Sequence, residues 1–281
     1  MNRRKTVIRA LLAVLFFLAI AVAMTFIVLP VIAIFTHVPP SRLFNELSNP
    51  VVTDALAVTL KTIVVSQIAI LLLGTPTAYF LASRRFPGRA LAVTLVELPI
   101  VLPPAVAGIG LLAAFGRLGL LGGTFKALGI DIAFTKVAVV MAVTYVASPF
   151  YLRAALAAFE AVDPNLPAAA RTLGAGPART FFRVALPLAA GGLGAGAALA
   201  FARGIGEFGA TIMFAGSLRG VTQTLSLAIY EQFDVNFDTA LAIGAELVIV
   251  SAALLLVVKL VIRWRRFNST YTIASAASSS S

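Results

Sequence analysis

Few side chains in this sequence could carry out chemistry, and their types exclude most catalytic classes. The chain of 281 residues contains one histidine and no cysteine. It therefore cannot form disulfides or use a cysteine nucleophile, and it lacks the side chains from which zinc centres are built. The single histidine, His37, follows a long apolar run and precedes Pro39 and Pro40, which is typical of an ordinary loop residue. We expect no metal site and no cofactor bound to this chain.

One pair of charged residues does fit a functional site. Arg203 and Glu207 are four residues apart in an apolar segment, so on a helix their side chains share one face and can pair. An ionisable pair within a membrane is costly and is a candidate functional site. A structural pairing of Glu207 with Arg203 is favoured over a direct role in a transport pathway.

The composition indicates what kind of protein must position this pair. Hydrophobic residues make up 60% of the chain and charged residues 12%, and the mean hydropathy is +1.00. So few charges cannot cover a soluble domain of this size, which indicates a polytopic membrane protein. The net charge of +11 would suit nucleic-acid binding, but the apolar content argues against it. In a membrane protein an excess of Lys and Arg usually reflects orientation.

Six apolar stretches are each long enough to cross a bilayer core of about 30 Å, which takes about 20 helical residues. They lie near residues 8–35, 56–82, 90–115, 136–158, 185–213 and 240–262. Because backbone groups in lipid must be paired within the segment, these runs predict helices and an all-α fold. The first run is too long for the apolar region of a cleaved signal peptide, so a retained first helix is favoured.

The distribution of basic residues predicts the orientation. With six spans, both termini and the loops after spans two and four share one face, which carries 14 of the 22 Lys and Arg residues, against 5 on the other. Basic residues concentrate on the cytoplasmic side. We therefore expect a multi-pass protein of the cytoplasmic membrane with both termini in the cytoplasm. A single transmembrane domain is predicted over 1–266, followed by a disordered or artificially appended tail over 267–281.

The longest predicted cytoplasmic loop, 159–187, includes the stretch "AAARTLGAGPARTFFRVALP". Its pattern predicts a short helix, then a second helix that opens at Pro177 and enters the membrane at Pro187. Residues suited to start or end the first helix are Asp163, Pro164, Asn165, Pro167, Gly174 and Gly176. Its arginines could hold the loop at anionic headgroups or dock a cytoplasmic partner.

The spacing in this loop favours docking, because it resembles the signature of binding-protein-dependent ABC importer permeases. That signature reads Glu-Ala-Ala, three residues, Gly, nine residues, Ile-x-Leu-Pro. The matching positions are Ala169, Ala170, Gly174, Val184, Leu186 and Pro187. The glutamate is missing, since Pro167 and Ala168 occupy its neighbourhood, which affects only the acidic contact of the family.

The resemblance implies a type I ABC importer permease fold in which 166–176 is a coupling helix inserted into a groove of an ATP-binding subunit. The residues implied in this coupling are Ala169, Ala170, Arg171, Leu173, Gly174, Ala175, Gly176, Leu186 and Pro187. The sequence has no Gly-x-x-x-x-Gly-Lys phosphate loop. This chain is therefore not expected to be an enzyme, and ATP and magnesium would bind the partner subunit.

Two further stretches, 86–112 and 199–230, resemble the permeases for molybdate or tungstate and their sulfate relatives. "GEFGATI" followed by "GVTQTLSLAIY" is closer to the molybdate group, so molybdate is favoured and sulfate or thiosulfate is the alternative. The resemblance implies a two-fold pair of this chain, two ATP-binding subunits and an extracytoplasmic binding protein, in a lipid bilayer and without nucleic acid.

Within this framework the translocation path is predicted at broken helices. Pro99, Pro103 and Pro104 interrupt the third span, either as a gate or as a fixed kink. Glu207 would repel an oxyanion, whereas a hydroxyl and backbone N–H groups near it suit one. The predicted path or gate residues are Pro103, Pro104, Gly206, Glu207, Gly209 and Thr211. Gly192 and Gly196 form a small-xxx-small pair, which indicates helix packing.

Two other classes remain as alternatives. A secondary transporter that works without ATP would place charges near the membrane midplane and show an internal repeat, and neither is convincing here. A membrane enzyme would need a cluster of His, Asp or Cys near one interface, and the sequence has one His and no Cys. Both classes rank below an importer permease.

Overall fold

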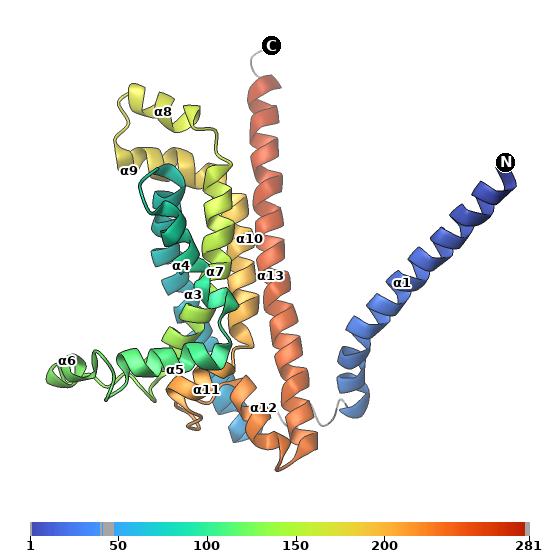
Figure 1. Cartoon of the computed structure of the whole chain (residues 1–281), viewed down its shortest axis with the longest axis vertical. Coiled ribbons are helices and arrows are strands. Elements are labelled where there is room, and N and C mark those ends of the chain that lie inside the picture. Colours follow the sequence, from blue (N-terminus) through green and yellow to red (C-terminus); the bar gives the residue numbers. More distant parts are fainter. Residues whose placement is uncertain (1, 40, 42–47, 279–281) are drawn as a thin grey trace.

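The computed structural model describes residues 2–39, 41 and 48–278, and these residues form helices joined by turns and short loops, with no strand among them (Figure 1). The bounds of the elements are α1 (Asn2–His37), α3 (Pro50–Ser83), α4 (Arg89–Val101), α5 (Pro104–Phe115), α6 (Gly122–Ala127), α7 (Lys136–Glu160), α8 (Asn165–Thr172), α9 (Pro177–Thr180), the π-helix η1 (Phe181–Ala185), α10 (Leu186–Ile205), α11 (Gly209–Ala215), α12 (Leu225–Phe233) and α13 (Phe237–Ser278). The all-α prediction is confirmed.

Five helical segments in the described part of the chain are long and apolar enough to cross a membrane, and α4 with α5 supplies a sixth if the two count as one span. The five are Leu11–His37, Pro50–Ser83, Lys136–Glu160, Pro177–Ile205 and Phe237–Val257. About six spans were expected, and this number is confirmed. His37 is the last residue of α1 rather than part of a loop, and its ring nitrogen Nδ1 lies 2.8 Å from the carbonyl oxygen of Ala33.

The third span, predicted over 90–115 with interruptions at its prolines, is broken into two helices. It consists of α4 and α5, whose axes meet at a bend of 116°. Leu102 and Pro103 are extended between the helices, and Pro104 occupies the first turn of α5, where a missing N–H does no harm. The 13 residues of α4 measure about 20 Å along the axis, less than the bilayer core. Pro103 and Pro104 therefore break the span, whereas Pro99 lies inside α4 and does not interrupt it. From the break α5 runs sideways out from the bundle (Figure 1).

The fifth span also has different bounds from the predicted 185–213. At one end α10 continues back through η1 and α9 to Pro177 without a break in the helical backbone. At the other end α10 stops at Ile205, and the chain is irregular until α11 begins at Gly209. Gly206 in this interval and Gly209 at the start of α11 weaken helix formation there.

Helices α3, α7 and α10 form the centre of the bundle and approach closely where glycines face larger residues. A Cβ atom added to Gly196 would lie 2.9 Å from Cβ of Ala154, and one added to Gly192 would overlap Cβ of Ala158. Both glycines lie on α10 and both alanines on α7, so the predicted packing role of this glycine pair is confirmed. Gln67 of α3 adds a polar link by donating from Nε2 to the carbonyl of Ala197, at 3.1 Å.

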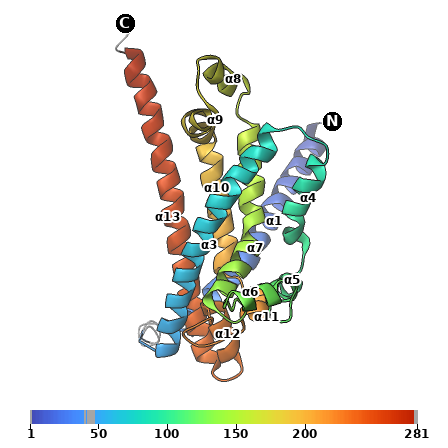
Figure 2. The same cartoon turned by 90° about the vertical axis from the view of Figure 1, so that its left-hand side faces the viewer.

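The ends of the helices are arranged so that α8 and α9 lie at the same end of the molecule as the beginning of α1 and the end of α13 (Figures 1 and 2). Helix α1 leans away from the bundle, and its most apolar window has no buried residue. Helix α13 runs through residues 267–278, where the sequence predicted a disordered tail. Alanines at 274, 276 and 277 favour a helix, and no Gly or Pro interrupts it.

Candidate coupling segment and translocation site

Helix α8 is the centre of the predicted coupling segment, and it begins and ends with specific hydrogen bonds. Oδ1 of Asp163 accepts a bond of 2.9 Å from the amide of Asn165, at the start of the helix. The helix ends at Thr172, so it is shorter than the 166–176 expected from the sequence. The remaining residues of that range form the turn into α9.

Gly174 closes α8 in a left-handed conformation, with φ at +83°. The amide of Ala175 donates to the carbonyl of Ala170 at 3.0 Å, and the amide of Gly174 donates to the carbonyl of Arg171 at 2.9 Å. This pair of bonds is the Schellman motif, which requires a positive φ and therefore favours glycine. Of the two glycines suited to end the helix, Gly174 does so and Gly176 is extended, at φ −65° and ψ 167°.

The turn from α8 is fastened to the next helices by Thr180. Its side chain is buried and its hydroxyl donates to the carbonyl of Gly176 at 3.1 Å. Beyond Thr180, η1 carries the helix into α10, which begins with Leu186 and Pro187. From Pro177 to Ile205 the helical backbone is therefore continuous, and one short turn separates it from α8.

The outer surface of the coupling segment is open in this chain. Leu173 is 88% exposed, and Ala168, Ala169 and Arg171 are exposed as well. Small side chains around one protruding leucine form a surface on which another protein can approach the backbone closely. Figure 2 shows α8 projecting beyond the ends of α3 and α10.

The second predicted site is the break between α10 and α11, which Glu207 spans. Its Oε2 lies 2.6 Å from Nη1 of Arg203, and its Oε1 accepts a bond of 2.8 Å from the amide of Ala210. The Glu207 side chain is 1% exposed and that of Arg203 is 29% exposed. The predicted pairing is therefore formed, and the same carboxylate also binds the first turn of α11, where negative charge is favourable.

Of the remaining predicted gate residues, only some lie close together. A Cβ atom added to Gly209 would lie 2.9 Å from Cβ of Pro104, so the starts of α5 and α11 are in close contact. Pro103 is exposed at the bend, and Gly206 is exposed with no atom near the position of a Cβ. Thr211 is fully buried, and its hydroxyl has no hydrogen-bond partner within the described residues. In this structure Thr211 therefore faces protein rather than an open path.

Sequence reasoning missed a group of buried polar residues next to this break. Thr222, Gln223 and Thr224 are all buried in the segment that leads into α12. The hydroxyl of Thr59 in α3 accepts a bond of 2.9 Å from the amide of Leu225, at the start of that helix. The sequence signal for this group is the run of three consecutive polar residues in "GVTQTLSLAIY".

Two ion pairs tie α4 to α7. Arg89 pairs with Glu160, and Nε of Arg153 lies 3.6 Å from Oε1 of Glu97. These contacts hold the broken span against the bundle next to the coupling segment.

Comparison with known proteins agrees with this architecture. Residues 70–266 match the family model for the binding-protein-dependent transport system inner membrane component. The chain is 42% identical to the molybdenum transport system permease protein ModB of Mycobacterium bovis, over 82% of this chain and 88% of that protein. It is 34% identical to the sulfate transport system permease protein CysW of Synechocystis, over 88% of this chain and 91% of that protein.

A solved structure shares the fold. The bacterial ABC transporter involved in the import of alginate aligns with a TM-score of 0.72 and 17% identity, over 94% of this chain and 99% of that one. This likeness is evidence for the fold alone. The matched length and the identity to the permeases together show that the chain belongs to the family of binding-protein-dependent transport system inner membrane components.

Proposed function

We propose that this chain is the transmembrane subunit of an ATP-driven importer that carries molybdate, or the similar tungstate, into the cytoplasm. The observation that carries the proposal is the exposed helix α8, which Gly174 closes and which a short turn joins to α9, where a continuous helix runs through η1 into the membrane-spanning α10. Such a helix can receive force from another subunit. The substrate assignment is supported by the higher identity to a molybdenum permease, 42%, than to a sulfate permease, 34%.

The proposed coupling runs from α8 to the break at Glu207. ATP binding would draw two ATP-binding subunits together, and each would move the α8 seated in its groove, with Leu173 as the apolar contact. The motion would reach α10 through the turn held by Thr180. At the far end of α10, Glu207 links Arg203 to α11, so α11 would move with α10. Two conformations of this unit would give alternating access.

The proposed path lies where α5 and α11 meet. Pro104 and Gly209 are in close contact there, which supports a constriction that would be closed in this conformation. Separation of α5 from α11 would expose the hydroxyl of Thr211 and backbone N–H groups near Gly206 and Gly209. Neutral donors of this kind suit a tetrahedral oxyanion, whereas the carboxylate of Glu207 stays occupied by Arg203 and Ala210.

The proposed assembly contains two copies of this chain, two ATP-binding subunits at the cytoplasmic end and a binding protein at the outer end. The concentration of basic residues in the loops on this face supports a cytoplasmic position for α8 and both termini. The family description names dependence on a binding protein, which supports that partner. ATP and magnesium would be held by the ATP-binding subunits.

Uptake into proteoliposomes tests this proposal. This chain, its ATP-binding subunit and its binding protein are reconstituted together, and labelled molybdate uptake is measured with and without ATP and with excess sulfate. ATP-dependent uptake that sulfate fails to block supports the proposal. Uptake abolished by modest sulfate would assign the importer to sulfate or thiosulfate, as the sulfate relative suggests. Uptake without ATP would contradict an ABC importer.

A further inference from the structure

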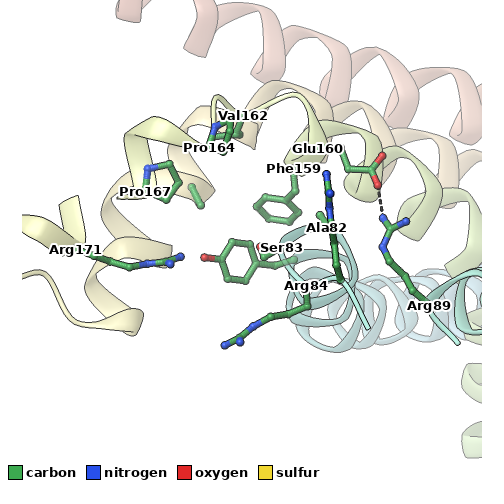
Figure 3. Close-up of a pocket in the computed structure, with 13 residues that line it drawn as sticks. Ala82, Ser83, Arg84, Arg89, Phe159, Glu160, Val162, Pro164, Pro167 and Arg171 are labelled. Atoms are coloured by element: carbon green, nitrogen blue, oxygen red, sulfur yellow. Dashed lines mark hydrogen bonds and ion pairs between the residues drawn. The ribbon is translucent and has the colours of Figure 1, made fainter. Parts of the chain in front are cut away.

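A basic cavity of about 570 Å³ lies beneath α8, away from the break between α10 and α11. It is enclosed by the end of α3, the start of α4, the end of α7 and α8, which come from widely separated parts of the chain (Figure 3). Four arginines line it, together with one carboxylate, Glu160. The four arginines are Arg84, Arg85, Arg89 and Arg171.

The only carboxylate in the lining is already paired. Arg89 binds Glu160 through Nη2 and donates from Nε to the carbonyl of Leu81 at 2.7 Å. Arg84, Arg85 and Arg171 take part in no ion pair within the part of the chain that the structure describes. In Figure 3, Arg89 is turned to Glu160, while Arg84 and Arg171 reach into the cavity region from α3 and α8. The cavity therefore presents three uncompensated positive charges.

The lining selects for a particular kind of anion. Guanidinium groups bind phosphate oxygens with two parallel hydrogen bonds, and several arginines around one space are typical of phosphate recognition. The volume is within the roughly 300–1,000 Å³ of small-molecule sites and far exceeds a lone tetrahedral ion, which fills only a few water volumes of about 30 Å³ each. The other walls include Tyr79, Phe159 and Ala185, which are suited to carbon rather than to water.

The position of the cavity indicates which kind of phosphate-containing molecule it binds. It lies where the spanning helices α3 and α7 end, at Ser83 and Glu160. Arginines at such ends meet the lipid headgroups, and basic clusters on the cytoplasmic side attract anionic lipids. We propose that the cavity binds the phosphate headgroup of an anionic lipid. Since Pro167 and Arg171 of α8 form one wall, the bound headgroup also fixes the position of α8.

Native mass spectrometry of the full chain in detergent tests binding, with phosphatidylglycerol as the anionic probe and phosphatidylcholine as the zwitterionic one. The variant Arg84→Gln/Arg171→Gln removes one charge from each of two walls. The control Arg179→Gln/Arg183→Gln removes two exposed charges from the same end of the chain that do not line the cavity. We expect the first variant to retain phosphatidylglycerol about tenfold less well and the control to match the unchanged chain.

Each alternative gives a different result. Equal loss in both double variants would mean general attraction of the loop to anions and would overturn the proposal. Displacement of phosphatidylglycerol by millimolar inorganic phosphate would assign the cavity to a free oxyanion instead. Equal retention of phosphatidylcholine would remove the requirement for negative charge and also overturn the proposal.

Hydrogen exchange on the unchanged chain tests whether the bound headgroup fixes α8, and this test needs no variant. Amides of residues 164–173 should exchange more slowly in nanodiscs of phosphatidylglycerol than in nanodiscs of phosphatidylcholine. Amides in the stretch 209–215 of α11 serve as an internal control and should not change. Equal exchange of 164–173 in both lipids would contradict the stabilisation of α8. These measurements need neither ATP nor substrate, so their failure leaves the proposed transport function untouched.

Discussion

The carboxylate of Glu207 reaches back one helical turn to the guanidinium of Arg203, with 2.6 Å between Oε2 and Nη1. The other carboxylate oxygen accepts a hydrogen bond from the amide of Ala210, so one side chain joins α10 and α11 across the interruption between them. We expect Glu207→Gln to keep the bond to Ala210 and lose the ion pair. Because Arg203 is partly exposed, the free energy of unfolding should fall by about 2 kcal/mol, less than for a fully buried pair.

Thermal unfolding in detergent measures this change, and the double variant Arg203→Gln/Glu207→Gln is the control. Removing both charges leaves no unpaired ion, so part of the lost stability should return. A different result would assign another role. If Glu207→Gln left the unfolding temperature unchanged but abolished molybdate uptake, Glu207 would act directly in the path rather than through Arg203.

Replacement of Gly174 by alanine should impair the coupling segment without affecting the bundle. Its φ of +83° costs an alanine roughly 1–2 kcal/mol, and no atom within 4 Å would obstruct the added methyl group. The expected result is weaker assembly with the ATP-binding subunit and reduced ATP-dependent uptake, with the unfolding temperature lowered by only a few degrees. Co-purification of the two subunits and proteoliposome uptake measure these effects.

Gly176→Ala is the matched control, because Gly176 is equally open but extended, a conformation that alanine adopts freely. It should assemble and transport better than Gly174→Ala, because it leaves the left-handed end of α8 intact. Normal assembly and uptake in Gly174→Ala would show that 166–176 is not the coupling helix.

Helix α10 should tolerate no added methyl group at Gly192. The new Cβ would overlap Cβ of Ala158 on α7, and such overpacking typically lowers the free energy of unfolding by about 1–3 kcal/mol. Gly244→Ala in α13 is the control, since nothing lies within 4 Å of its Cβ position. There alanine should raise stability by up to about 1 kcal/mol through its higher helix propensity. Equal unfolding temperatures for the two variants would contradict the close packing of α7 and α10.

Gly209→Ala should disturb the constriction. An added Cβ would lie 2.9 Å from Cβ of Pro104, so α5 and α11 would have to separate slightly. We expect altered molybdate uptake, through either leak or block, with stability lowered by roughly 1 kcal/mol. Gly110→Ala in α5, with no atom within 4 Å of the added Cβ, should transport normally. Normal transport by both variants would place the path away from the contact of α5 with α11.

The sequence predicted best those elements that depend on long apolar runs. The spans in α1, α3, α7 and α13 were expected because twenty or more apolar residues leave a helix as the one way to pair the backbone in lipid. The prolines at 103 and 104 predicted a break, but the bend of 116° depends on how α5 packs against α11.

Within the candidate sites, features set by neighbouring residues could be predicted from the sequence, whereas contacts between distant residues could not. Either Gly174 or Gly176 could have ended α8, and the backbone angles alone separate them. The pairing of Arg203 with Glu207 could be predicted from their spacing. The hydrogen bond from Ala210 could not, because it forms only when the helix is interrupted after Ile205. Arg84 and Arg171 meet across one cavity only because α3 and α8 end at the same place, which no local pattern records.

The π-helical turn at Phe181–Ala185 sets the rotational phase between the coupling segment and the bundle. Here the amide of Leu186 donates to the carbonyl of Phe181, five residues earlier rather than four. Successive residues of an α-helix are about 100° apart around its axis. Loss of one residue from this turn would therefore rotate the preceding α8 and α9 by about 100° around the axis of α10. The number of residues in η1 therefore sets the direction in which α8 points. A single deletion here should misdirect the segment more severely than any substitution on its surface.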